Sequence, residues 1–122
     1  IYATTTATAA NVNVDSSGVL KRSTSSLRYK TDITPATHGL NEVLALNPVT
    51  YKGIHDGDTV FGGLIAEEVD AVGLSEFVVY DSEGRPDALA YSNMVSLLIK
   101  AIQEQQSVIE ELKTRVAAVE SK

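Results

Sequence analysis

The sequence predicts an α+β protein with a short β segment at its N-terminus, a small α/β unit in the middle and a long C-terminal helix. Residues 3–10 are all Ala or Thr and lead into an alternating stretch at 11–14. Short apolar runs separated by turn residues fill the middle of the chain, and a heptad pattern is sustained over residues 95–119. A length of 122 residues suits one small domain with appendages.

The composition excludes several classes of protein. Hydrophobic residues make up 43% of the chain, enough for a modest core that association would help to stabilise. The absence of cysteine excludes disulfides and thiolate metal sites, and a net charge of −6 argues against nucleic acid as a partner. No apolar run approaches the roughly 18 residues of a membrane span, so no membrane is expected. Because the sequence starts without Met or a signal peptide, we expect it to be a piece of a longer chain.

Residues 1–24 predict two short strands around a tight turn. Residues 11–14 alternate between polar and apolar, residues 15–18 have turn composition, and residues 19–22 can form the second strand. Two strands alone are marginally stable. We therefore expect this segment to pair with neighbouring chains or with upstream sequence, and a disordered linker is the alternative.

The next elements form the predicted α/β unit. Thr34 as N-cap and Pro35 at the first helical position predict a helix that continues through 40–46 and ends at Asn47-Pro48. Residues 49–52 then predict a short strand.

Further along, the glycines within 60–65 indicate a strand with a bulge or close backbone packing, because no Gly-Lys-Ser/Thr follows to make a phosphate loop. Residues 66–72 predict a helix that ends at Gly73. Two apolar runs, 77–80 and 88–91, flank turn residues and predict a hairpin.

Side chains in this region offer little catalytic or metal chemistry. Residues 55–58 have the composition of a solvated loop and lack the twelfth-position Glu of a calcium loop. The carboxylates Glu67, Glu68 and Asp70 could be taken for a glycosidase pair, but acidic residues on a short helix usually form its solvated face. The two histidines, His38 and His55, stand apart. No cofactor and no metal are expected.

Residues 92–122 predict a coiled-coil helix with Ser92 as N-cap. An unbroken 3-4 spacing places Val95, Ile102, Ile109 and Val116 at a, and Leu98, Gln105, Leu112 and Val119 at d. Ile99 at e, with Ala101 and Val108 at g, widens the apolar face, as expected if the globular part or a third helix also covers the first half. The alternative is a single amphipathic helix lying on its own domain. The pattern alone would favour a dimer, and Gln105 is expected to fix the register.

Between the β segment and the α/β unit, Ser25 and Lys30 form a possible nucleophile and base. A serine hydroxyl needs a base to remove its proton, and a lysine can serve only when it is neutral. An ordinary lysine has a pKa of about 10.4, so a lysine that is half neutral near pH 7 needs a pKa about 3 lower. Burial is the usual cause of such a change. Any activity should therefore depend on a folded, partly dry environment around Lys30. Taken alone, a Ser five residues before a Lys is more simply explained by a polar linker followed by a solvated Arg/Lys pair.

The surrounding residues resemble one family. The run Ser25-Ser26-Leu27-Arg28-Tyr29-Lys30-Thr31-Asp32-Ile33 is similar to the start of the C-terminal intramolecular chaperone domain of phage endosialidases, tail fibres, tailspikes and neck appendages. The stretches 46–51, 63–69 and 91–92 follow in the same order, so the resemblance covers roughly 25–122. Three positions depart from the common pattern. Ser26 stands where an acidic or amide residue is frequent, Tyr29 replaces an aliphatic residue, and Glu67 stands where Gln is common.

The resemblance implies a self-cleaving serine endopeptidase that acts once, in cis. Ser25 would be the nucleophile, Lys30 the base, and Thr24-Ser25 the bond that is cut. Residues 1–24 would then be the end of an upstream β-rich fibre or appendage protein, and 25–122 the chaperone, whose helix forms a trimeric coiled coil. The partners would be two further copies and the upstream domain. Assembly would occur in the host cytoplasm, with the chaperone absent from the mature virion. A non-cleaving trimerisation module and a receptor-binding tip remain the alternatives.

Overall fold

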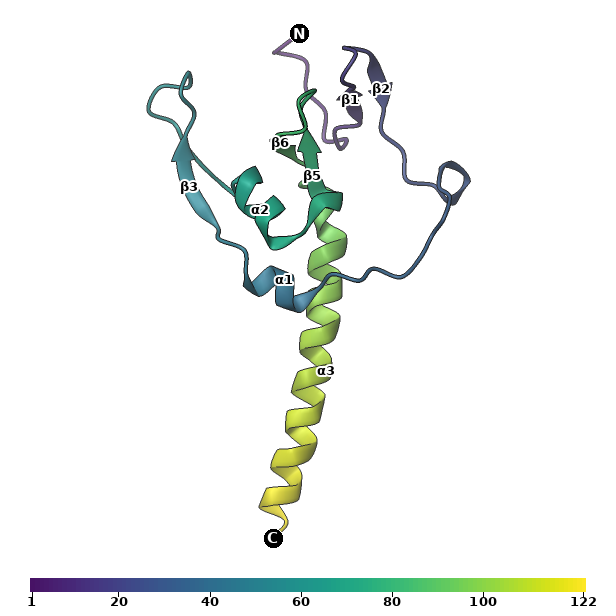
Figure 1. Cartoon of the computed structure of the whole chain (residues 1–122), viewed down its shortest axis with the longest axis vertical. Coiled ribbons are helices and arrows are strands. Elements are labelled where there is room, and N and C mark those ends of the chain that lie inside the picture. Colours follow the sequence, from purple (N-terminus) through teal and green to yellow (C-terminus); the bar gives the residue numbers. More distant parts are fainter. The chain divides into compact units, whose positions relative to one another are not determined.

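The computed structural model describes residues 1–122 and divides into two compact units, Ile1–Pro35 and Ala36–Lys122 (Figure 1). The predicted division between Thr24 and Ser25 concerns a bond to be cut rather than a boundary between folded units, and it stays a prediction.

The first unit contains a β-hairpin in the place that the sequence predicted. Strands β1 (Val12–Val14) and β2 (Leu20–Arg22) pair antiparallel, and every residue of both strands is exposed. The Asp15 carboxylate accepts hydrogen bonds from two backbone amides of the turn, both at 2.9 Å, and pairs with Lys21 Nζ at 2.9 Å. The hydrogen bond from Lys21, and then those from the turn amides, hold the pKa of Asp15 below its ordinary value. The predicted hairpin is confirmed, and its outer edges are free to pair.

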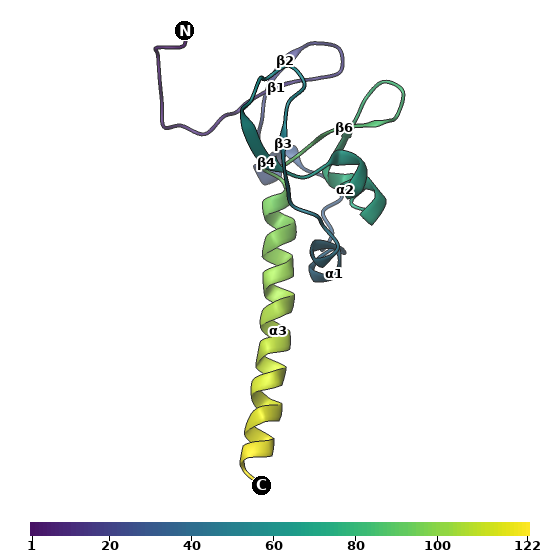
Figure 2. The ribbon, with the colours of Figure 1, turned by 90° about the vertical axis from the view of Figure 1, so that its left-hand side faces the viewer.

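The second unit consists of two hairpins, short helices and one long helix. Its elements are α1 (Leu40–Leu44), β3 (Val49–Lys52), β4 (Val60–Gly63), α2 (Ala66–Val72), η2 (Ser75–Phe77), β5 (Val78–Tyr80), β6 (Pro86–Leu89) and α3 (Met94–Glu120). The pairs β3–β4 and β5–β6 are separate antiparallel two-stranded sheets. Short helices α1 and α2 lie near the N-terminal half of α3 in both views (Figures 1 and 2).

A small apolar core joins these elements to the first turns of α3. Its buried members are Val69, Leu74, Phe77, Val78, Met94 and Leu97. Partly buried side chains from α1, β4, α2 and β6 and their flanks pack around it. Because the core involves only the beginning of α3, the C-terminal half of that helix has no other element of this unit beside it.

Most of the predicted elements of this unit are confirmed. The strand over 49–52, the helix over 66–72 and the hairpin within 77–91 all form. Helix α2 ends where predicted, because Gly73 adopts the left-handed conformation at φ 97° and its amide bonds back to Asp70.

The prediction that a helix starts at Thr34 and Pro35 is wrong. Helix α1 begins at Leu40, and residues 33–39 form no helix or strand. Two carboxylates cap its first turn instead. Glu42 Oε1 accepts the Gly39 amide at 2.8 Å, and Glu104 Oε1 of α3 accepts the Leu40 amide at 3.1 Å. The start of α1 is therefore determined by a partner far along the chain.

The prediction that Ser92 caps the last helix is also wrong, by one residue. Helix α3 begins at Met94 with Asn93 in the N-cap position, and residues 91–93 form a turn. The amides of Asn93 and Met94 bond to the carbonyl of Ala90, so backbone hydrogen bonds rather than the Ser92 hydroxyl close the first turn.

Tyr91 fastens the β3–β4 hairpin to the start of α3. Its hydroxyl accepts the Leu64 amide at 2.9 Å and donates to the Leu64 carbonyl at 3.2 Å. A Cβ atom placed on the neighbouring Gly63 would lie 2.7 Å from the Tyr91 hydroxyl. This confirms close backbone packing as a reason for glycine in the 60–65 strand.

Candidate functional site

A single 3-10 turn brings Ser25 and Lys30 together. In η1 (Leu27–Tyr29) the Tyr29 amide bonds to the Ser26 carbonyl and the Lys30 amide bonds to the Leu27 carbonyl, both at 3.0 Å. Five residues of extended chain would span about 17 Å, whereas the turn shortens this path. As a result, Lys30 Nζ donates a hydrogen bond to Ser25 Oγ at 2.9 Å. The two residues that the sequence singled out are in direct contact.

The surroundings of this pair are polar and open in a single chain. Thr24, Ser25 and Lys30 are all exposed. Lys30 belongs to none of the ion pairs of the chain, so no carboxylate neutralises its amine. Only a neutral lysine can act as a base, and burial favours the neutral form, so base catalysis would require that the pair be removed from water.

A second basic side chain, Arg28, reaches back to the same place. Its Nη1 donates to Ser26 Oγ at 3.3 Å, and its guanidinium carbon lies 4.6 Å from the centre of the Tyr29 ring. Ser26 and Tyr29 are two of the positions at which the sequence departs from the common family pattern. Sequence reasoning did not assign Arg28 a role, although its position within the motif was visible.

Two other titratable groups that the sequence raised, Asp70 and His38, have partners of their own. On α2, Asp70 accepts a hydrogen bond from the Tyr80 hydroxyl, which raises the pKa of Tyr80. His38 Nδ1 lies 2.6 Å from Glu76 Oε2, and this hydrogen bond raises the pKa of His38. No group of three or more His, Cys, Asp or Glu side chains is arranged to hold a metal ion.

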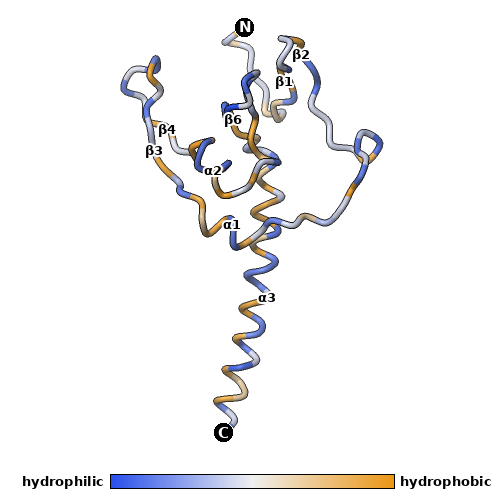
Figure 3. The backbone as a smooth tube through the Cα atoms, viewed as in Figure 1, coloured by the Kyte–Doolittle hydropathy of each residue, from blue (hydrophilic) through white to orange (hydrophobic).

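Helix α3 carries two sets of apolar side chains, one buried and one exposed. Met94, Leu97 and Ala101 are buried against the helix's own domain, which confirms the expectation that the globular part covers the widened face at Ala101. The predicted a and d side chains remain exposed, and Ile102 is still 63% exposed. Hydrophobic positions recur along the helix beyond the domain (Figure 3).

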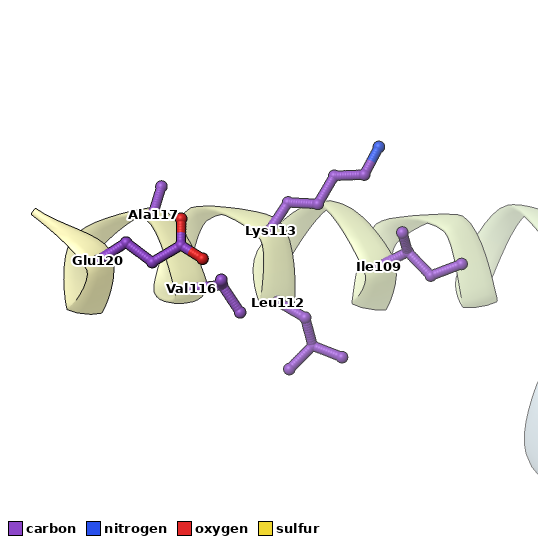
Figure 4. Close-up of a pocket in the computed structure, with 6 residues that line it drawn as sticks. All are labelled: Ile109, Leu112, Lys113, Val116, Ala117 and Glu120. Carbon is purple, nitrogen blue, oxygen red and sulfur yellow. The ribbon is translucent and has the colours of Figure 1, made fainter.

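The C-terminal half of the exposed stripe forms a shallow groove. It is lined by Ile109, Leu112, Lys113, Val116, Ala117 and Glu120. Leu112 and Val116 project from the same side of the helix (Figure 4). Three of these six residues are the a and d positions predicted for the coiled coil, so the groove is the seam of the heptad pattern without a facing helix.

Comparison with known proteins finds a family match over part of the chain. Residues 25–79 match the family described as chaperone of endosialidase. No curated protein and no solved structure matches the chain. The match over residues 25–79 confirms the resemblance to this family that the sequence predicted.

The family match covers the middle of the chain and leaves both ends outside it. It begins at Ser25, the predicted nucleophile, and extends into β5, so α3 and residues 1–24 lie outside it.

None of the helices combines the length and apolar character that crossing a membrane would require.

Proposed function

We propose that this chain is an intramolecular chaperone that gathers three copies of a phage tail fibre, tailspike or neck appendage and is then released by cutting itself between Thr24 and Ser25. The observation that carries the proposal is the hydrogen bond of 2.9 Å between Lys30 Nζ and Ser25 Oγ, formed by the first residue of the family match.

The chemistry follows from the position of the nucleophile directly after the bond. Lys30 in its neutral form takes the hydroxyl proton of Ser25, and Oγ attacks the carbonyl carbon of Thr24. When the bond between the Thr24 carbonyl carbon and the Ser25 nitrogen breaks, Lys30 gives this proton to the nitrogen. The peptide bond is thereby converted into an ester. Water then hydrolyses the ester, which leaves a carboxylate on Thr24 and restores the Ser25 hydroxyl.

Association would supply the dry environment that a single chain lacks. Three α3 helices pairing along their exposed seams would bring three copies of 1–35 together and raise the local concentration of the right strands. Long-range β pairing is slow, because loop closure must precede the contacts. The free edges of β1 and β2 are suited to such pairing. Cleavage after folding would make the assembly hard to reverse, since the chaperone has departed.

The exposure of Ser25 and Lys30 favours one other candidate. A plain trimerisation module would associate through α3 in the same way and would leave the Thr24-Ser25 bond intact. The two functions differ only in whether folded, associated chains are cut.

The test compares intact masses of the purified protein and three variants under native conditions. The normal chain is expected to give fragments of 24 and 98 residues, since 122 minus 24 is 98. Ser25→Ala and Lys30→Met should stay whole while remaining trimeric by light scattering. Lys52→Met removes another exposed lysine, on β3, and should cut normally. If every form stays whole while trimeric, self-cleavage is wrong and the trimerisation module is the better account.

A further inference from the structure

Two basic side chains converge on two adjacent serines at the candidate site. Lys30 donates to Ser25 Oγ at 2.9 Å, and Arg28 donates to Ser26 Oγ at 3.3 Å. The proposed reaction uses Lys30 and leaves Arg28 without a role. A role for Arg28 in this reaction rests on the proposed function.

The charge around the scissile bond is positive although the chain as a whole is negative. Residues 21–31 include four basic side chains and no acidic one, whereas the net charge of the chain is −6. Lys21 is neutralised by Asp15, but Arg28 takes part in none of the ion pairs. An arginine keeps its charge at any working pH. The turn that follows the nucleophile therefore holds a permanent positive charge that belongs to no ion pair.

The guanidinium of Arg28 is also partly fixed in direction. Its carbon lies 4.6 Å from the centre of the Tyr29 ring, within the range of a cation–π contact. A guanidinium has five N–H donors, and only one hydrogen bond, to Ser26 Oγ, occupies them here. The backbone amides of Tyr29 and Lys30 are engaged inside the turn, so neither is free to bind an anion. Arg28 is the charged donor beside Ser25 and Ser26 that the proposed proton transfer leaves unused.

We propose that Arg28 stabilises the oxyanion that forms when Ser25 attacks Thr24. The bond between Ser25 Oγ and the Thr24 carbon moves an electron pair onto the Thr24 carbonyl oxygen, while the hydroxyl proton goes to Lys30. Arg28 donates hydrogen bonds to this oxygen and transfers no proton. When the carbon–oxygen double bond reforms, the carbon–nitrogen bond breaks and the Ser25 nitrogen takes the proton from Lys30. Arg28 ends the step unchanged.

The experiment measures the first-order rate constant of cleavage against pH after refolding of the full chain. Removing one oxyanion donor typically lowers a rate about 100- to 1000-fold, so Arg28→Gln should cut that much more slowly at every pH. The pH at which the rate is half-maximal should not move, because Lys30 still takes the proton. Arg28→Lys should recover part of the rate. Arg22→Gln, which removes an exposed arginine from β2, should stay within about twofold of normal.

Three results would overturn the inference. Arg28→Gln could cut within about threefold of the normal rate, well short of the loss of an oxyanion donor. Its pH midpoint could shift with an unchanged maximal rate, which would mean that Arg28 acts on the proton of Lys30. Arg28→Lys could be as slow as Arg28→Gln, which would mean that the charge is not what matters.

Controls separate the inference from the proposed function. Circular dichroism and native mass check folding and association, and Arg28→Met is the second neutral variant should Arg28→Gln not fold. If the normal chain itself is not cut in the same experiment, the proposed function fails. If the normal chain is cut and the Arg28 variants are cut equally fast, only the role of Arg28 is wrong.

Discussion

The substitution Leu112→Ala tests whether the exposed stripe of α3 holds copies of the chain together. Leu112 is a predicted d residue, is 50% exposed in the single chain and lines the groove with Ile109 and Val116. Fully burying a leucine contributes about 1.5–3 kcal/mol, and about half of that burial remains to be gained on association. With one Leu112 in each of three chains, the substitution should weaken the free energy of trimer association by about 2–4 kcal/mol. This corresponds to roughly a 30- to 700-fold lower association constant.

Sedimentation equilibrium in the Ser25→Ala background, which keeps the chain whole, measures this effect. Ser107→Ala is the matched control, because Ser107 is exposed on α3 at an f position away from the seam. Alanine favours helix at least as well as leucine, so α3 itself should persist by circular dichroism. Equal association of the Leu112→Ala, Ser107→Ala and parent chains would refute the assignment of this stripe as the interface.

Three further predictions concern the Tyr91 contact with the β3–β4 hairpin, the His38–Glu76 ion pair and the exposed apolar stripe of α3. Gly63→Ala should lower the free energy of unfolding in urea by about 1–3 kcal/mol, because its Cβ would meet the Tyr91 hydroxyl at 2.7 Å. Glu76 raises the pKa of His38, so the pair stabilises the fold below the unfolded pKa of about 6.5 and the effect is lost as pH rises through the folded pKa. The difference in stability between the normal chain and His38→Gln should accordingly shrink between about pH 6 and 8. Gln105→Leu should raise the melting temperature and broaden the distribution of oligomers, because a polar seam residue fixes register at some cost in stability.

Each of these has a contrary result. An unchanged urea midpoint for Gly63→Ala would mean that the Tyr91 side chain moves aside at little cost in stability. A His38→Gln difference that stays constant across the pH range would show that the ion pair with Glu76 does not contribute. A lower melting temperature for Gln105→Leu would show that this side chain does not face an apolar partner.

Elements whose signals are local could be predicted from the sequence. Helix α2 ends at Gly73 because a left-handed residue is needed there, and the heptad pattern of α3 is periodic along one helix. The start of α1 could not be predicted in the same way. Thr34 and Pro35 are suitable residues for a helix start, but the carboxylate of Glu104, on α3, caps the helix at Leu40 instead. The local preference for a helix start at Thr34 and Pro35 was therefore overridden by a tertiary contact.

The candidate site could likewise be predicted only where its signals are local. The spacing of Ser25 and Lys30 together with the family motif identified the pair, and the turn that joins their side chains is local. The contacts of Arg28 with Ser26 and Tyr29 depend on how one long side chain folds back over the turn, which no periodicity reveals. The exposure of Ser25 and Lys30 agrees with the polar-linker alternative, whereas the chemistry of the pair requires a dry environment.

The central claim is that association completes the site, and the dependence of cleavage on chain concentration tests it most directly. Unfolded chains diluted out of denaturant over a wide range of concentrations are sampled for intact mass and oligomeric state, with Ser25→Ala as the uncut control. The account predicts that cleavage slows as the chain is diluted and that the fragments appear only after trimers form. Cleavage at the same rate in chains that are still monomeric would contradict it.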